Sequence, residues 1–245
     1  MVDARKLVAG FLLAGASTGL AVGVTVQAAP AGATMAADTS ASTLYRDALA
    51  TTHAWSVHYN SSSTDAAQTL VESGDAGPAS ASQTVTMGQG TISILVIGGL
   101  SYVKGNSAGL ESLAGLSSSQ ADEAAGQWIA FSTDNTALAP VVEGVRSTDI
   151  AKELALKAPL SLGKTRTLDG VSVDAIEGIQ KFGKKSQHVV LYVRARGTHV
   201  PVEEDSVDSK GQHTDAEHIV YSKWGEQVRP TAPTATISVG SISAV

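Results

Sequence analysis

The sequence predicts an α+β fold in which an antiparallel β-sheet carries helices on one side. Alternating apolar and polar residues mark the strands, most clearly in residues 91–97. Two residue pairs that favour tight hairpins, Gly98-Gly99 and Asp169-Gly170, join neighbouring strands. The chain runs through strands, then helices, then strands, without a repeated strand–helix–strand unit. This order argues against a doubly wound parallel sheet.

The first part of the chain contributes a short helix and five strands. Apolar residues at helical spacing predict a helix over residues 43–51. In the strand that follows, Trp55, Val57 and Tyr59 alternate with polar residues and share the buried face. Gly74 indicates a turn or a bulge between the second and third strands. The predicted strands are residues 53–61, 69–73, 83–87, 91–97 and 100–104.

The middle of the chain is predicted to be helical. Leu110 and Leu113 have helical spacing, and Ser117 with Gln120 forms a capping box for a second short helix. A longer helical stretch covers residues 138–156, with a break inside it. The remaining predicted strands are residues 127–132, 165–168, 171–176, 188–195, 200–206 and 218–224.

Composition limits the possible functions. The 245 residues are 43% hydrophobic and 16% charged, which suits one domain with a continuous core. The net charge of −6 argues against nucleic acid as a partner, because an acidic surface repels phosphate. Since there is no cysteine, disulfides, thiolate catalysis, zinc–thiolate sites and iron–sulfur clusters are excluded.

The N-terminus has the pattern of a secretory signal peptide. Arg5 and Lys6 precede an apolar stretch that ends in small residues. An uncleaved membrane anchor is the alternative interpretation. In both cases the protein is exported and is secreted or held in the cell envelope. The expected division is a leader over residues 1–33, a flexible segment over 34–42, a single domain over 43–229 and a loose tail over 230–245.

Several segments, taken together, resemble a known protein family. Residues 95–106 look like its central hairpin, and residues 126–129 look like its Gly-x-Trp-hydrophobic strand start. Residues 167–171 are similar to its later hairpin, and residues 222–228 are similar to its closing strand. In this order and spacing they resemble the LppX/LprG envelope lipoproteins of mycobacterial type over most of residues 40–232.

This resemblance implies a LolA-like half-barrel, in which a curved antiparallel sheet packs helices on its concave side around an apolar cavity for acyl chains. It also implies transient contact with a membrane. The family carries a lipidated cysteine after its signal peptide, whereas this chain contains no cysteine. We therefore expect a form of the fold without a lipid anchor.

The sequence offers little catalytic chemistry. It has no Gly-x-Ser-x-Gly elbow and no phosphate-binding Gly-Lys-Ser/Thr loop. His213, Asp215, Glu217 and His218 are the tightest group of potential metal ligands, but a solvated polar turn is the preferred interpretation. The acidic run at residues 203–205 is expected on an exposed edge strand. We expect neither enzyme activity nor a cofactor or metal.

Two functions fit these observations. The first is a non-enzymatic binding protein for a lipid or another apolar molecule, held by burial of apolar surface between sheet and helices. It requires that the helices leave a void against the sheet. The second is a module that binds another envelope protein, with the cavity collapsed. The residues expected to line the ligand site are Ile92, Ile94, Val96, Leu110, Leu113, Trp128, Val141, Val142 and Val145.

Overall fold

The computed structural model describes residues 40–65, 68–133, 135, 138–182, 185–208 and 215–242. The predicted leader over residues 1–33 lies outside this part of the chain. The described chain begins at Ser40, whose hydroxyl accepts a hydrogen bond from the Thr43 backbone N–H and caps the first helix. Among the described helices, none is both long enough and apolar enough to cross a membrane.

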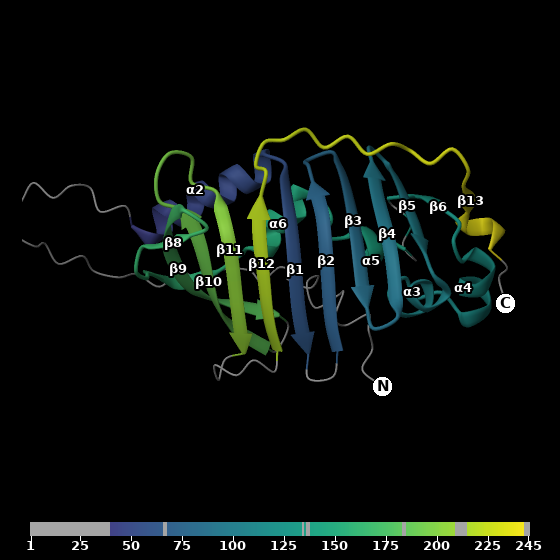
Figure 1. The fold of residues 1–245 in the computed structure, drawn as a ribbon, viewed down its shortest axis with the longest axis horizontal. Helices are drawn as coiled ribbons and strands as arrows, with labels where there is room; N and C mark the ends of the chain where they lie inside the picture. The colour runs from purple at the N-terminus through teal and green to yellow at the C-terminus, as the bar shows by residue number, and fades with distance from the viewer. Residues whose placement is uncertain are drawn as a thin grey trace, which may run out of the picture.

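A single sheet forms the body of the protein, and thirteen strands of the described residues belong to it (Figure 1). They are β1 (Val57–Asp65), β2 (Gln68–Ala76), β3 (Ser80–Met87), β4 (Gly90–Ile97), β5 (Leu100–Gly105), β6 (Ile129–Ser132), β7 (Lys157–Leu162), β8 (Arg166–Leu168), β9 (Val171–Phe182), β10 (Lys185–Arg194), β11 (Pro201–Asp208), β12 (Asp215–Ser222) and β13 (Ile237–Ser238). Their order is β13-β6-β5-β4-β3-β2-β1-β12-β11-β10-β9-β7, with β8 paired to β9. The sheet is antiparallel except for the β13–β6 pair.

The helices pack on one side of this open, curled sheet, which confirms the predicted fold class. Helices α2, α5 and α6 lie behind the sheet in the view of Figure 1, and α3 contacts β4 and β5. The helices are α2 (Ala41–Ala54), α3 (Ser107–Ser112), α4 (Ser118–Ala124), α5 (Ala139–Val142) and α6 (Ser147–Glu153), followed by the 3-10 turn η2 (Val239–Ser241).

The local signals in the sequence form the structures that they predict. The β4–β5 hairpin turns at Gly98, whose φ is +61°, and Asp169 and Gly170 join β8 to β9 with φ of 47° and 81°. Ser117 and Gln120 make the reciprocal hydrogen bonds of a capping box at the start of α4. These elements depend on near neighbours in the chain, and the sequence therefore specifies them well.

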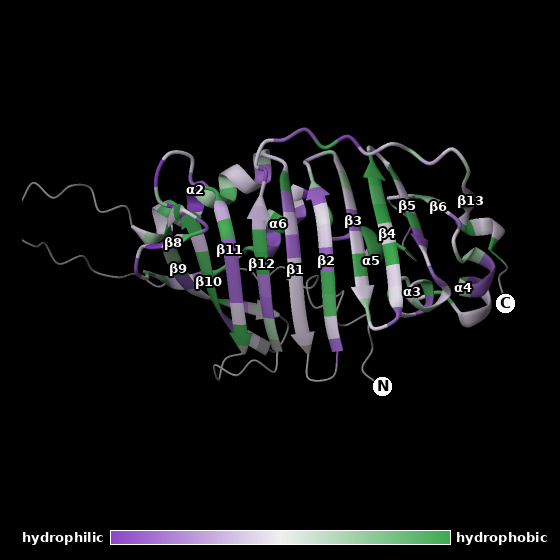
Figure 2. Ribbon diagram, in the orientation of Figure 1, coloured by the Kyte–Doolittle hydropathy of each residue, from purple (hydrophilic) through white to green (hydrophobic). Residues whose placement is uncertain are grey.

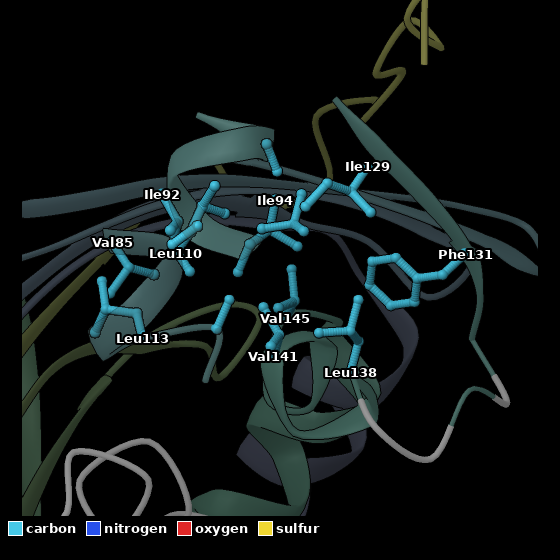
Figure 3. Packing of buried hydrophobic residues seen from close by; sticks show 14 of the residues in the cluster. Val85, Ile92, Ile94, Leu110, Leu113, Ile129, Phe131, Leu138, Val141 and Val145 are labelled. Carbon is cyan, nitrogen blue, oxygen red and sulfur yellow. The ribbon is translucent and has the colours of Figure 1, made fainter. Parts of the chain in front are cut away.

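Two separate apolar cores lie between the sheet and the helices. The first core, shown in Figure 3, joins the inner residues of β3–β6 to α3, α4 and α5, and includes Ile94, Leu110 and Val145. The second core joins α2 and α6 to β1, β2, β9, β10 and β12, and includes Leu44 and Leu191. All five side chains are at most 2% exposed. The sheet is thus continuous, while its hydrophobic core is divided.

The C-terminal segment crosses the edge of the sheet from β12 to β6. We call residues 223–242 the strap; Figure 1 shows it in yellow along one end of β1–β5. The Ser80 hydroxyl donates to the Val228 carbonyl at 3.0 Å, and Ile237 pairs in parallel with Ile129 of β6. Ile242 is 5% exposed within the first core. The prediction of a loose tail over residues 230–245 is therefore wrong for residues 237–242, where apolar side chains pack.

Other differences lie at element boundaries. Helix α2 runs to Ala54, so Trp55 becomes its C-cap and is 41% exposed instead of facing the core. Gly74 lies inside β2 and not in a turn. It pairs with Tyr59 of β1, whose ring packs against it. A Cβ at Gly74 would lie 2.9 Å from that ring. Strand β7 was not predicted, since neither of its faces is buried and it shows no alternation.

The strap provides a test of stability. Ile242→Ala should lower the free energy of unfolding by about 2 kcal/mol or more, because it removes a buried side chain from the first core. Thr236→Ala, at an exposed position of the same segment, should leave it within about 0.5 kcal/mol. Urea unfolding of the two variants measures both. Equal stabilities would mean that the end of the strap does not pack.

Candidate functional site

A band of polar side chains separates the two cores on the inner face of the sheet. We call it the polar seam; it runs across β3, β2, β1, β12 and β11. Register places Ser61 of β1 opposite Glu72 of β2 on one side and Ile219 of β12 on the other, and Ile219 opposite Glu204 of β11. The members of the polar seam are Tyr59, Ser61, Glu72, Gln83, Glu204, Glu217 and Tyr221.

A cavity of about 50 Å³ lies over the polar seam, at the junction of the two cores. Its floor comes from the sheet, and its cover comes from α5, α6 and the segment between them. The apolar part of the lining, which we call the apolar wall, consists of Leu70, Val85, Ile92, Ile94, Leu113, Val141, Ile150 and Ile219. The polar part, which we call the carboxyl wall, includes Tyr59, Ser61, Glu72, Gln83, Glu143, Glu153, Glu217 and Tyr221. The two kinds of side chain share one hollow.

The size of the cavity limits what it holds in this conformation. Sites that enclose drug-sized ligands have volumes of roughly 300–1,000 Å³. A volume of about 50 Å³ has room for a few water molecules. A void therefore lies between the sheet and the helices, but the wider void that the carrier prediction requires is not present in this conformation. A long hydrocarbon tail would fit only if the cover moved.

Three carboxyl groups that line the cavity, and Glu204 beside them in the polar seam, have raised pKa values. Burial raises the pKa of Glu72 to about 7, and burial likewise raises the pKa of Glu204 to about 7. Burial, reinforced by neighbouring carboxylates, raises the pKa values of Glu153 and Glu217 well above their ordinary range. None of the described residues that line the cavity is Lys, Arg or His. The carboxyl groups therefore lack a cationic partner in the cavity and favour their neutral form.

Hydrogen bonds satisfy this wall only in part. The Ser61 hydroxyl donates to Glu217 at 3.5 Å, and the Tyr221 hydroxyl donates to Glu204 at 3.3 Å. Both distances are long for O–H···O bonds. The Tyr59 hydroxyl and Glu153 Oε1 are buried without a hydrogen-bond partner. A buried polar atom without a partner costs about 1–3 kcal/mol. The unpartnered atoms of this wall therefore lower the stability of the folded chain.

The structure distributes the nine predicted lining residues between the cavity and its surroundings. Ile92, Ile94, Leu113 and Val141 line the cavity. Val96, Leu110 and Val145 are buried in the first core, and Val142 packs against it; none of these four lines the cavity. Trp128 is partly buried away from the cavity, with Lys104 Nζ at 6.0 Å from its ring centroid. Whether these residues bind a ligand stays a prediction.

Sequence reasoning missed the glutamates of the polar seam. The prediction that residues 203–205 lie on an exposed edge strand is wrong, because β11 lies between β10 and β12. Glu204 is 4% exposed on the inner face, while Glu203 and Asp205 face outward. A signal was available: Glu217 is two residues from Ile219 and four from Tyr221, and period-two alternation puts all three on one face.

The group of potential metal ligands, for which a solvated polar turn was the preferred interpretation, is divided by the same alternation, because residues 215–222 form β12. Glu217 points inward, whereas His218 points outward and contacts Asp205 at 2.7 Å. His213 lies outside the described residues. On the outer face Glu203, Asp205 and His218 bring ligand atoms within 4.8 Å of one another. Arg166 pairs with Glu203 at 3.0 Å, so an ion pair and a His218–Asp205 hydrogen bond account for these groups.

Comparison with known proteins supports the fold. No protein-family model matches the chain, and no curated protein matches its sequence. LprF from Mycobacterium bovis matches with a TM-score of 0.51 and 12% identity, over 80% of this chain and 97% of LprF. MucB in complex with MucA, from Pseudomonas aeruginosa, matches with a TM-score of 0.40 and 12% identity, over 84% of this chain and 61% of MucB.

The class that these findings define is a LolA-like α+β fold, an open and curled antiparallel sheet with few helices. This agrees with the architecture that the sequence resemblance implies. Membership of the LppX/LprG family itself stays a prediction, because an identity of 12% shows the fold alone.

The glutamates predict a distinctive pH dependence. Carboxyls whose pKa is raised by folding bind more protons in the native chain than in the unfolded chain, so the free energy of unfolding falls as pH rises. Given values of about 7 for Glu72 and Glu204 and higher values for Glu153 and Glu217, this loss should extend from about pH 4.5 through neutral pH. Urea unfolding over that range measures it.

A matched pair of variants isolates the cause. Glu217→Gln should raise the free energy of unfolding by about 1–3 kcal/mol at about pH 8 and flatten the pH dependence, because a neutral amide replaces a buried acid. Glu203→Gln, on the outer face of the neighbouring strand, should preserve the slope. A stability that is constant or rises between about pH 5 and about pH 8 would contradict the assignment.

Proposed function

We propose that this chain is an exported, non-enzymatic binding protein for a lipid or another apolar molecule with a polar end. The ligand is held between the sheet and the helices. Its apolar part packs on the side of Ile92, Ile94 and Val141, and its polar end lies at the polar seam. The export signal rests on the N-terminal sequence alone.

The observation that carries this proposal is the mixed character of the cavity. It lies where two apolar cores meet, yet the Tyr59 hydroxyl and Glu153 Oε1 are buried there without partners. A solid structural core would be more stable with apolar residues at these positions. Polar atoms that a stable fold does not require, next to an apolar wall, support a site that an amphipathic ligand completes.

The cover over the cavity is suited to opening. Helix α5 has four residues and α6 has seven, and neither has a side-chain cap. Short helices owe their stability to packing and open locally at low cost. Displacement of this cover would remove Val141 and Val145 from the first core and uncover apolar side chains beside the cavity, on which a tail that the closed form excludes could pack.

A second function is favoured by the cavity volume. If the cover does not move, about 50 Å³ leaves no place for a tail, and the chain acts as a module that binds another envelope protein. Lipid content separates the two proposals. Native mass spectrometry of the protein from its own host should detect a bound apolar molecule in the first case and none in the second.

The position of the tail can be tested with neighbouring residues of α5. Val141→Phe should weaken binding of decanol by about tenfold or more, because the larger side chain fills the cavity. Val142→Phe is the control, since Val142 does not line the cavity. Titration calorimetry with decanol measures both. Equal affinities of the two variants would place the ligand elsewhere.

A further inference from the structure

Building on the proposed function, we propose that the ligand carries an ammonium group at its polar end and that the polar seam binds this group. The ligand class is therefore a cationic amphiphile, an alkyl chain or comparable apolar body with a primary amine. The amine would lie between the carboxyl groups of the sheet and the carboxyl group of Glu153, which belongs to α6 and lines the cavity.

Charge complementarity selects the cation. The lining of the cavity includes Glu72, Glu143, Glu153 and Glu217, and none of its described residues is basic. An anionic head group would face the buried Glu217 and the part-buried Glu72 and Glu153 without a counter-charge, at a high cost. An ammonium supplies the missing charge in the same place. Its binding would favour the ionised carboxylates and thus release protons.

The unpartnered atoms point to a donor-rich group. Tyr59 is 5% exposed, lines the cavity and leaves its hydroxyl without a partner, and Glu153 Oε1 is likewise buried and unpaired. Once a bound cation has favoured its ionised form, a carboxylate only accepts hydrogen bonds, and the Tyr59 hydroxyl can accept one as well as donate one. A primary ammonium has three N–H donors. It can therefore satisfy two carboxylates and the Tyr59 hydroxyl together, whereas an alcohol head group donates a single hydrogen bond.

The spacing of the carboxyl groups argues against a metal ion at the same place. Calcium takes six to eight oxygen ligands at about 2.3–2.6 Å, which requires the oxygens to be close together. Among the described residues, the only three acidic or histidine side chains with ligand atoms within 4.8 Å of one another are Glu203, Asp205 and His218 on the outer face. No three of the described inner carboxyl groups reach this spacing, whereas a calcium site needs more ligands than three. A primary ammonium needs only two carboxylates together with the Tyr59 hydroxyl.

Three alkyl ligands of equal length provide the test. Titration calorimetry of the full chain at about pH 8, below micelle formation, would compare decylamine, decanol and decanoate. Decylamine should bind more tightly than decanol by about tenfold or more, the contribution of one charge-assisted hydrogen bond, and decanoate should bind least tightly. If decanol or decanoate binds as tightly as decylamine, the ammonium assignment is overturned while the proposed function stands. If none binds and no apolar molecule co-purifies, the proposed function itself fails.

Variants of two glutamates that line the cavity, one in the polar seam and one in α6, locate the effect. Glu217→Gln and Glu153→Gln should each reduce the preference for decylamine over decanol by about tenfold and leave decanol affinity nearly unchanged. Glu203→Gln should preserve the preference, because Glu203 faces the opposite side of the sheet and pairs with Arg166. An unchanged preference in both inner variants would overturn the assignment.

Tyr59→Phe tests the same site with a substitution that should not impair folding. It removes one unpartnered hydroxyl and keeps the ring against Gly74, so the fold should be at least as stable as before. The preference for decylamine should nevertheless fall by severalfold, and decanol binding should persist. Calcium chloride alone serves as the metal control. Saturable calcium binding that is lost in Glu217→Gln would overturn the ammonium assignment in favour of a metal site.

Discussion

The antiparallel pairing of β1 with β12 is the interaction on which the rest of the structure depends. Residues 58–65 face residues 215–222 in an unbroken register, and this pairing joins the meander β1–β6 to the meander β9–β12. Without it each meander would expose an unpaired strand edge, which is a template for aggregation. The pairing also brings Glu72 and Glu217, which are far apart in the sequence, onto one inner face.

The division of the core follows from the residues that this pairing brings together. Apolar side chains dominate the inner faces on both sides of the junction. Figure 2 shows the difference in hydropathy along the sheet: β11 is largely hydrophilic (purple), and β4 is hydrophobic (green) toward its end. At the junction the inner residues are acids and hydroxyls instead. Their burial is tolerable while the carboxyls are neutral. In the closed form, protons therefore neutralise the buried carboxyl groups. In the open form, we propose that a cationic ligand neutralises them instead.

The parts of the fold that the sequence predicts are those set by short-range signals. The turn at Gly98-Gly99, the Asp169-Gly170 hairpin and the Ser117 capping box all depend on residues within a few positions of one another. The β1–β12 pairing joins segments more than 150 residues apart, and no local pattern specifies its register. The candidate site depends on that register. Its apolar wall was therefore predicted in part, whereas its carboxyl wall was missed because glutamate was assumed to face solvent.

The strap has a mechanical consequence. It leaves the sheet at β12 and rejoins it at β6, at the far end of the first meander. Tension applied at the C-terminus therefore reaches η2, β13 and the first core before it reaches β12. The pairing that unites the two meanders is shielded from a pull at that end, and the outermost strands yield first.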